Sequence, residues 1–138
     1  MLPLNEEIKN MRRYLEIEKV RFGDRLQCEF EIPLECNDIN VPAMLLQPVY
    51  ENAIKRGLYE SVEPVCIRTY CQPRHDHLEI SIINNYAPDS TPVKGEGVGL
   101  ENVRNKLFLF YSRKDLLSIT RENNHFEVKF ILPVKQKP

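Results

Sequence analysis

The sequence predicts a two-layer α/β sandwich, in which a mixed, mostly antiparallel five-stranded sheet carries its helices on one face. Three stretches have apolar residues at helical spacing, and five short stretches have the composition of strands. Three helices are too few to cross over between every pair of strands, so most neighbouring strands must be antiparallel. At 138 residues the chain suits one domain that buries roughly two thirds of its unfolded surface.

A long charged helix is predicted from Leu4 to Phe22. Its apolar residues recur at alternating steps of four and three, with Glu18 in the one polar position. This heptad seam either packs on the helix's own domain or pairs with a second chain, and its abrupt start is typical of a cut through a longer coil. A strand from Leu26 to Ile32 follows, with alternating apolar and polar residues. The seam consists of Leu4, Ile8, Met11, Leu15 and Phe22.

A second helix is predicted from Val41 to Leu58, with Pro42 in its first turn. At about 100° per residue its side chains divide into two opposite arcs. The apolar arc, which belongs to the core, comprises Leu46, Val49, Tyr50, Ala53 and Gly57. The polar arc comprises Gln47, Glu51, Asn52, Lys55 and Tyr59, with Arg56 at its edge. A carboxylate, a carboxamide and an amine in one patch can hold a metal ion beside an anion, and the alternative is a solvated helix face.

The second half of the chain is predicted to contain two antiparallel hairpins. The first joins strands at Val65–Cys71 and Leu78–Ile83, and the last joins strands at Leu116–Thr120 and Phe126–Leu132. Between the hairpins, the stretch from Asn84 to Pro92 is so rich in Asn, Pro and Ser that we expect a mobile loop.

A glycine-rich stretch precedes the third predicted helix, which runs from Leu100 to Tyr111. Gly95, Gly97 and Gly99 lead directly into its N-terminus. Such a junction exposes backbone N–H groups and the positive end of the helix to an anion. The alternative is a flexible hinge before an ordinary helix.

Composition excludes several classes of protein. The formal net charge of −1 gives no overall field that would attract nucleic acid. Without CxxC spacing, the cysteines are expected to be reduced thiols in a reducing cytoplasm, and the histidines to be solvated turn residues. No apolar run approaches the roughly 18 residues of a membrane span. The residues concerned are Cys28, Cys36, Cys66 and Cys71, and His75, His77 and His125.

Three blocks together resemble the ATP-binding part of LytS/YehU-type sensor histidine kinases. They occur in the family's order and span most of the chain: Tyr14–Glu18 with Arg21–Phe22, then Leu46–Gly57, then Gly95–Val103. The resemblance implies the Bergerat fold of histidine kinases, gyrase, Hsp90 and MutL, in which ATP lies between a helix called the N-box and a flexible lid. It also implies that residues 1–23 belong to a dimerisation or linker helix and residues 24–138 to the ATP-binding catalytic domain.

The resemblance assigns roles to individual residues. Asn52 would coordinate the Mg²⁺ that bridges the ATP phosphates, and Lys55 with Arg56 would neutralise phosphate oxygens. Glu51 would bind or orient a metal-bound water, so Glu51, Asn52 and Lys55 form the expected catalytic group. The nucleotide would further contact Asn84, Gly97, Gly99, Leu100 and Asn102.

Two departures from the family pattern bear on the nucleotide site. Arg56 stands where the family commonly has histidine. Asn84 stands where the family has an aspartate that accepts a hydrogen bond from adenine, and the glycines that follow this aspartate are missing. A neutral acceptor bonds adenine less strongly than a charged one. A non-catalytic dimerisation or interaction module with the same fold is therefore the alternative to a kinase domain.

For the intact protein the resemblance implies transfer of the ATP γ-phosphoryl group to a histidine and relay to a response regulator. None of the three histidines of this sequence has the context of the phosphorylated residue. We therefore expect a catalytic fragment, inactive alone, of a homodimeric and membrane-anchored sensor. Its phosphoacceptor helix would precede residue 1, and the fragment would lie in the cytoplasm.

Overall fold

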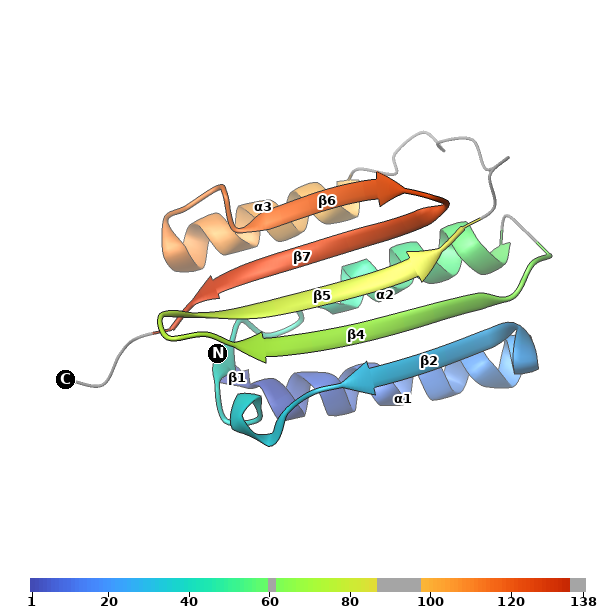
Figure 1. Cartoon of the computed structure of the whole chain (residues 1–138), viewed down its shortest axis with the longest axis horizontal. Helices are drawn as coiled ribbons and strands as arrows, with labels where there is room; N and C mark the ends of the chain where they lie inside the picture. The colour runs from blue at the N-terminus through green and yellow to red at the C-terminus, as the bar shows by residue number, and fades with distance from the viewer. Residues whose placement is uncertain (60–61, 87–97, 135–138) are drawn as a thin grey trace.

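A five-stranded sheet with three helices behind it forms the body of the protein (Figure 1). The computed structural model describes residues 1–59, 62–86 and 98–134. The strand order is β2-β4-β5-β7-β6, and within the described residues only the β2–β4 pair of this sheet is parallel. The predicted two-layer sandwich with a mixed, mostly antiparallel sheet is confirmed. The strands are β2 (Leu26–Glu31), β4 (Val65–Pro73), β5 (His77–Asn85), β6 (Leu117–Glu122) and β7 (His125–Pro133).

The three helices are α1 (Leu4–Phe22), α2 (Gln47–Ile54) and α3 (Val98–Tyr111). Shorter elements join them to the sheet. A small antiparallel pair links β1 (Leu2–Pro3) to β3 (Asn40–Val41). Single helical turns lie at Gly23–Arg25 (η1), Leu34–Cys36 (η2) and Lys55–Tyr59 (η3), the last of them π-helical. None of the described helices has the length and apolarity that a membrane span requires.

Helix α1 has the predicted bounds, and its seam packs on its own domain. Leu4, Ile8, Met11 and Leu15 are each at most 5% exposed and belong to the same core as the sheet. At the end of the helix, Lys19 Nζ donates a hydrogen bond to the Leu26 carbonyl oxygen at 2.9 Å. The seam is thus occupied within the domain.

Helix α2 is shorter than predicted, because residues 41–46 are not helical. Val41 pairs with Leu2 in the small sheet, and Met44 has a φ of +59°, which a right-handed helix excludes. The helix begins only at Gln47, with Pro48 rather than Pro42 in its first turn. The predicted apolar arc is confirmed, since Leu46, Val49, Tyr50 and Ala53 are at most 2% exposed.

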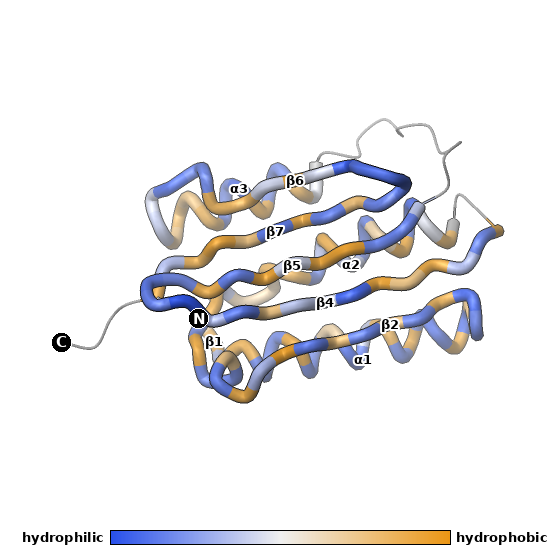
Figure 2. Tube along the Cα trace, in the orientation of Figure 1, coloured by the Kyte–Doolittle hydropathy of each residue, from blue (hydrophilic) through white to orange (hydrophobic). Residues whose placement is uncertain are grey.

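The sheet has one face packed on the helices and one open face. Buried and more exposed residues alternate along β4, β5 and β7, and the matching alternation of hydropathy is visible in Figure 2. The predicted loop start at Asn84 is wrong, because Asn84 and Asn85 are the last residues of β5. The Asn85 side chain accepts a hydrogen bond from Cys66 N at 2.7 Å and donates one to the Pro64 carbonyl oxygen at 2.9 Å. These side-chain bonds tie the end of β5 to the start of β4, beyond the last paired residues of the two strands, Ile67 and Asn84.

Both predicted hairpins are present. In the last one, Asn123 and Asn124 have φ values of +51° and +63°, as a two-residue turn between β6 and β7 requires. All four cysteines lie within the described residues and are free thiols. In the described ranges, no three His, Cys, Asp or Glu side chains converge as a metal site would require.

Gly57 packs so closely on β4 that it offers a test of this fold. A methyl group added to Gly57 would lie 2.5 Å from Cγ2 of Val65. We expect Gly57→Ala to lower the free energy of unfolding by about 1–3 kcal/mol, as measured by urea denaturation. Gly99→Ala is the control, because its added methyl group would lie at an ordinary 3.9 Å from Pro48 Cβ. Equal stability of the two variants would contradict the close packing.

The turn between β4 and β5 places His77 between two carboxylates. Its Nδ1 lies 2.6 Å from Asp76 Oδ1 and its Nε2 lies 3.3 Å from Glu79 Oε1. The hydrogen bond with Asp76, and then that with Glu79, raises the pKa of His77 above its usual 6.5. The protonated ring therefore stabilises the fold, fully below about pH 6.5, and this contribution is lost as the pH rises through the folded-state pKa.

We expect Asp76→Asn to lower the pKa of His77, followed by NMR titration of its ring protons. The variant replaces the charged acceptor that contributes most to the raised pKa with a neutral one, which bonds the protonated ring less strongly. Asp24→Asn, which removes an exposed carboxylate in η1, controls for the loss of one negative charge. An unchanged His77 titration in Asp76→Asn would show that this contact has no effect on the ring.

Candidate functional site

The polar arc of α2 faces away from the core, as predicted. Glu51 and Lys55 are exposed and Asn52 is half-buried. The Glu51 carboxylate accepts a hydrogen bond from Gln47 Nε2 at 2.9 Å, which leaves its second oxygen for other partners. The outer side of this helical segment therefore carries the Glu51 carboxylate, the Asn52 carboxamide and the Lys55 ammonium group within five residues.

The opposite side of α2 is anchored to the sheet by a buried hydrogen bond. The hydroxyl groups of Tyr50 and Thr69 bond each other between α2 and β4, and both residues are at most 1% exposed. Burial raises the pKa of Tyr50, so the phenol stays neutral and can donate or accept this bond. Rotation of α2 about its axis would break the bond, so the polar arc has a defined direction.

Arg56 does not share the exposure of Lys55. It lies in η3, directly after α2, and is only 5% exposed. The sequence interpretation placed it at the edge of the polar arc, beside Lys55. In the structure the exposed positive charge at this end of α2 is that of Lys55.

The first turn of α3 lies against the first turn of α2. A methyl group at Gly99 would lie at an ordinary van der Waals distance of 3.9 Å from Pro48 Cβ, so the two helices are neighbours at this point. Leu100 is a core residue at 6% exposure, and only its backbone can take part in a surface site. Asn102 is exposed, and Gly97 lies outside the described residues.

Asn84 lies inside the protein, near the end of β5. It is 3% exposed and sits on the sheet face that also carries Ile80 and Ile82, the face packed on the helices. Its Nδ2 donates a hydrogen bond to the Asn85 carbonyl oxygen at 3.2 Å. The structure therefore places a buried, neutral carboxamide where the family resemblance expects a carboxylate.

Sequence reasoning missed Glu7, a buried carboxylate that binds the segment before α2. Glu7 is 1% exposed, and one of its oxygens accepts a hydrogen bond from Met44 N at 2.9 Å. The available signal was its spacing, because Glu7 lies three residues after Leu4 and four before Met11 and so falls on the apolar stripe of α1.

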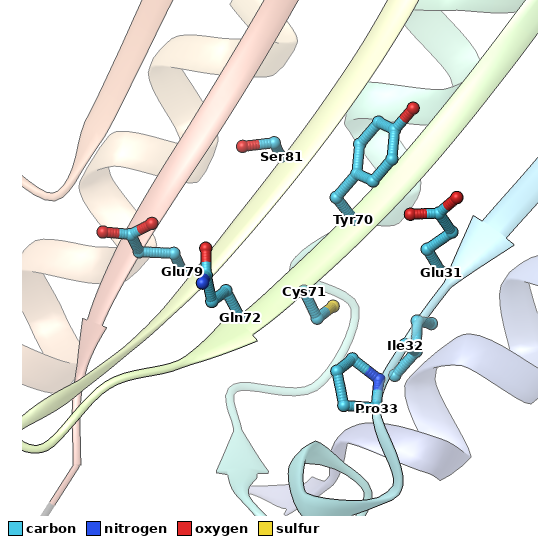
Figure 3. A pocket seen from close by; sticks show the side chains of 8 residues that line it. All are labelled: Glu31, Ile32, Pro33, Tyr70, Cys71, Gln72, Glu79 and Ser81. Carbon is cyan, nitrogen blue, oxygen red and sulfur yellow. The ribbon is translucent and has the colours of Figure 1, made fainter.

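A hollow of about 490 Å³ lies on the open face of the sheet, between the ends of β2, β4 and β5 (Figure 3). Its carboxylates are those of Glu31 and Glu79, and Glu79 is engaged by Arg74 at 3.6 Å and His77 at 3.3 Å. The hollow is separated by the sheet from α2 and α3. It is therefore not part of the arrangement formed by the two helices.

Comparison with known proteins identifies sensor kinases as relatives. No family model matches the chain. The sensor histidine kinase BtsS of Escherichia coli K12 is 34% identical over 104 residues, which are 75% of this chain and 18% of BtsS. The sensor protein LytS of Oceanobacillus iheyensis is 26% identical over an alignment of 149 positions, which covers 98% of this chain and 26% of LytS. The chain thus spans about a quarter or less of these relatives.

Solved structures of histidine kinases have the same fold. The nucleotide-free catalytic domain of the histidine kinase ThkA matches with a TM-score of 0.72 at 17% identity, covering 96% of this chain and 95% of that one. The mycobacterial sensor histidine kinase MprB matches with a TM-score of 0.65 at 16% identity, covering 99% of each chain. The sequence relatives show that the chain is homologous over most of its length to the LytS and BtsS sensor histidine kinases. The solved structures show that it has the fold of a histidine kinase catalytic domain.

Proposed function

We propose that this chain is the ATP-binding catalytic domain of a sensor histidine kinase and binds Mg²⁺-ATP between α2 and the start of α3. The observation that carries the proposal is that the N-terminus of α3, at Gly99, lies next to Pro48 in the first turn of α2, one helical turn before Asn52. The N–H groups and positive dipole at that N-terminus attract phosphate oxygens.

The residues present fit this ligand at its phosphate end. The side-chain oxygen of Asn52 is a hard ligand of the kind that Mg²⁺ prefers. Asn52 is half-buried, so this oxygen is accessible to a bound metal ion. Lys55 is exposed and can neutralise a phosphate oxygen, whereas Arg56 is buried and takes second place. Glu51 would hold or orient a water molecule of the metal.

Binding at the other positions follows the family pattern. The backbone N–H groups at Gly97, Gly99 and Leu100 would hold phosphate oxygens, and the Asn102 side chain would add a polar contact. Asn84 would accept a hydrogen bond from the adenine amino group.

The proposed reaction is phosphoryl transfer to a histidine. The bound nucleotide supplies the γ-phosphoryl group, whose bond to the ADP oxygen breaks as a bond to an imidazole nitrogen forms. The residues of this chain position the phosphates and balance their charge, which is the main source of catalysis in phosphoryl transfer. The acceptor histidine would lie on a helix outside these 138 residues.

Partners and location are also proposed from the relatives. ThkA has been solved in complex with the response regulator TrrA, which supports a response regulator as the partner of this protein. The sequence relatives are sensor proteins several times as long as this chain, which supports a domain within a longer sensor. A membrane anchor, a cytoplasmic position for this domain and a homodimer are proposed from the family resemblance.

A second candidate function is a non-catalytic dimerisation or interaction module. It is favoured by Asn84, because a buried neutral carboxamide holds adenine less strongly than a carboxylate. In this alternative the fold is retained but the nucleotide site is degenerate.

Asn52→Ala tests the metal role at the phosphate end. We expect Mg²⁺ to strengthen binding of a non-hydrolysable ATP analogue to the wild type, and the variant to bind at least about tenfold more weakly in Mg²⁺. Isothermal titration calorimetry with and without Mg²⁺ measures both. Asn105→Ala, an exposed asparagine on α3, is the matched control. Equal affinity of Asn52→Ala and wild type would refute the metal role.

Asn84→Asp separates the kinase domain from the degenerate module. If the native site binds adenine weakly through Asn84, the charged acceptor should raise ATP affinity by about tenfold. The nucleotide-free variant should also melt at a lower temperature, because a carboxylate is costly to bury. Asn105→Asp adds the same charge on the surface as a control. No analogue binding by wild type or Asn84→Asp at millimolar concentration would support the degenerate module.

A further inference from the structure

The segment before α2 is held by a buried carboxylate from α1. Glu7 accepts a hydrogen bond from Met44 N at 2.9 Å. Burial raises the pKa of this carboxyl group, and the backbone N–H groups of Met44, Leu46 and Leu45 act against that rise. Backbone N–H groups near a carboxylate stabilise its charged form. Met44, Leu45 and Leu46 are the last three residues before α2 begins at Gln47.

The conformation of this segment needs such support. Met44 has a φ of +59°, in the left-handed region, which is unfavourable for a long side chain. The Met44 side chain is itself 61% exposed, so its packing does not hold the backbone in place. The buried Glu7 carboxylate holds the backbone at Met44 through the hydrogen bond from Met44 N.

Helix α3 also contacts this segment, through Lys106. Lys106 Nζ donates a hydrogen bond to the Ala43 carbonyl oxygen at 2.8 Å, and its positive charge acts on Glu7. Lys106 and Gly99 are seven residues apart and so lie on one side of α3. The helix therefore meets residues 43–48 at two points, Lys106 at Ala43 and Gly99 at Pro48.

We propose that Glu7 is a positioning residue of the nucleotide site, which fixes the start of α2 against α3 and thereby sets the separation of the two walls that hold the phosphates. The inference rests on the proposed function, because it concerns the same site. It connects that site to α1, a helix to which no nucleotide contact is assigned in the proposed function. Lys106 supports the same segment from α3.

A purely structural role for Glu7 makes a different prediction. Loss of a buried hydrogen-bond acceptor lowers global stability in either case. If Glu7 only stabilises the fold, variants that remain folded bind nucleotide as the wild type does. If Glu7 positions α2, nucleotide affinity falls even far below the melting temperature, and the backbone of residues 44–52 opens more often.

The test uses Glu7→Gln, which keeps the shape of the side chain but removes its charge and turns one acceptor into a donor. Glu6→Gln is the matched control, since Glu6 is exposed on the same helical turn and lies 3.6 Å from Lys9 Nζ. Lys106→Met removes the contact to Ala43 and gives a second variant in case Glu7→Gln does not fold. Melting temperature, amide hydrogen exchange and calorimetric affinity for a non-hydrolysable ATP analogue with Mg²⁺ are measured on each.

For Glu7→Gln we expect at least about tenfold faster exchange at residues 44–52, unchanged exchange in the central strand β5, and about tenfold weaker analogue binding. Glu6→Gln should match the wild type in all three measurements. If Glu7→Gln is unfolded, the test uses Lys106→Met instead. We expect this variant to show faster exchange at residues 44–52 and weaker analogue binding than the wild type, both by a smaller factor than given for Glu7→Gln.

The outcomes separate this inference from the proposed function. If the wild type binds the analogue and the folded variant, Glu7→Gln or Lys106→Met, binds it with the same affinity, the positioning role is overturned. The proposed function then still stands. A wild type that binds no analogue overturns the proposed function, and the positioning role falls with it.

Discussion

The packing of α2 on the sheet is the constraint on which the rest of the structure depends. Its apolar arc is buried, its Tyr50 hydroxyl bonds Thr69 of β4, and the turn that follows meets β4 through Gly57. These contacts leave one orientation for the helix, in which Glu51, Asn52 and Lys55 face outward. The polar arc is therefore directed by interactions that belong entirely to the core.

The sequence predicted the sheet and α1 well, because these elements have a strong and regular apolar pattern. The bounds of α1 are those predicted, and the alternation along the strands identified the buried face. The start of α2 was wrong because periodicity cannot detect the pairing of Val41 with Leu2 or the positive φ of Met44. Asn84 was assigned to a loop from its composition, whereas register with its neighbours keeps it in β5.

The candidate site was predicted unevenly for a related reason. Residues on one helix, such as Glu51 and Lys55, share a face that spacing alone reveals. The approach of Gly99 to Pro48 and the burial of Arg56 depend on tertiary packing, and no local pattern contains them. Glu7 was missed because a carboxylate on an apolar stripe is usually a solvated neighbour of the core, and its partners lie 37 residues further along the chain.

The parallel pairing of β2 with β4 gives α2 a part in folding as well as in the proposed nucleotide site. Parallel strands cannot be joined by a tight turn, so the chain leaves β2, passes through α2 and returns as β4. The register of β2 against β4 therefore requires closure of a long loop, and such non-local pairing forms slowly. A substitution that weakens the packing of α2 on the sheet would therefore also weaken the pairing of β2 with β4. Substitutions in the helix that carries the polar residues thus also affect the folding of the domain.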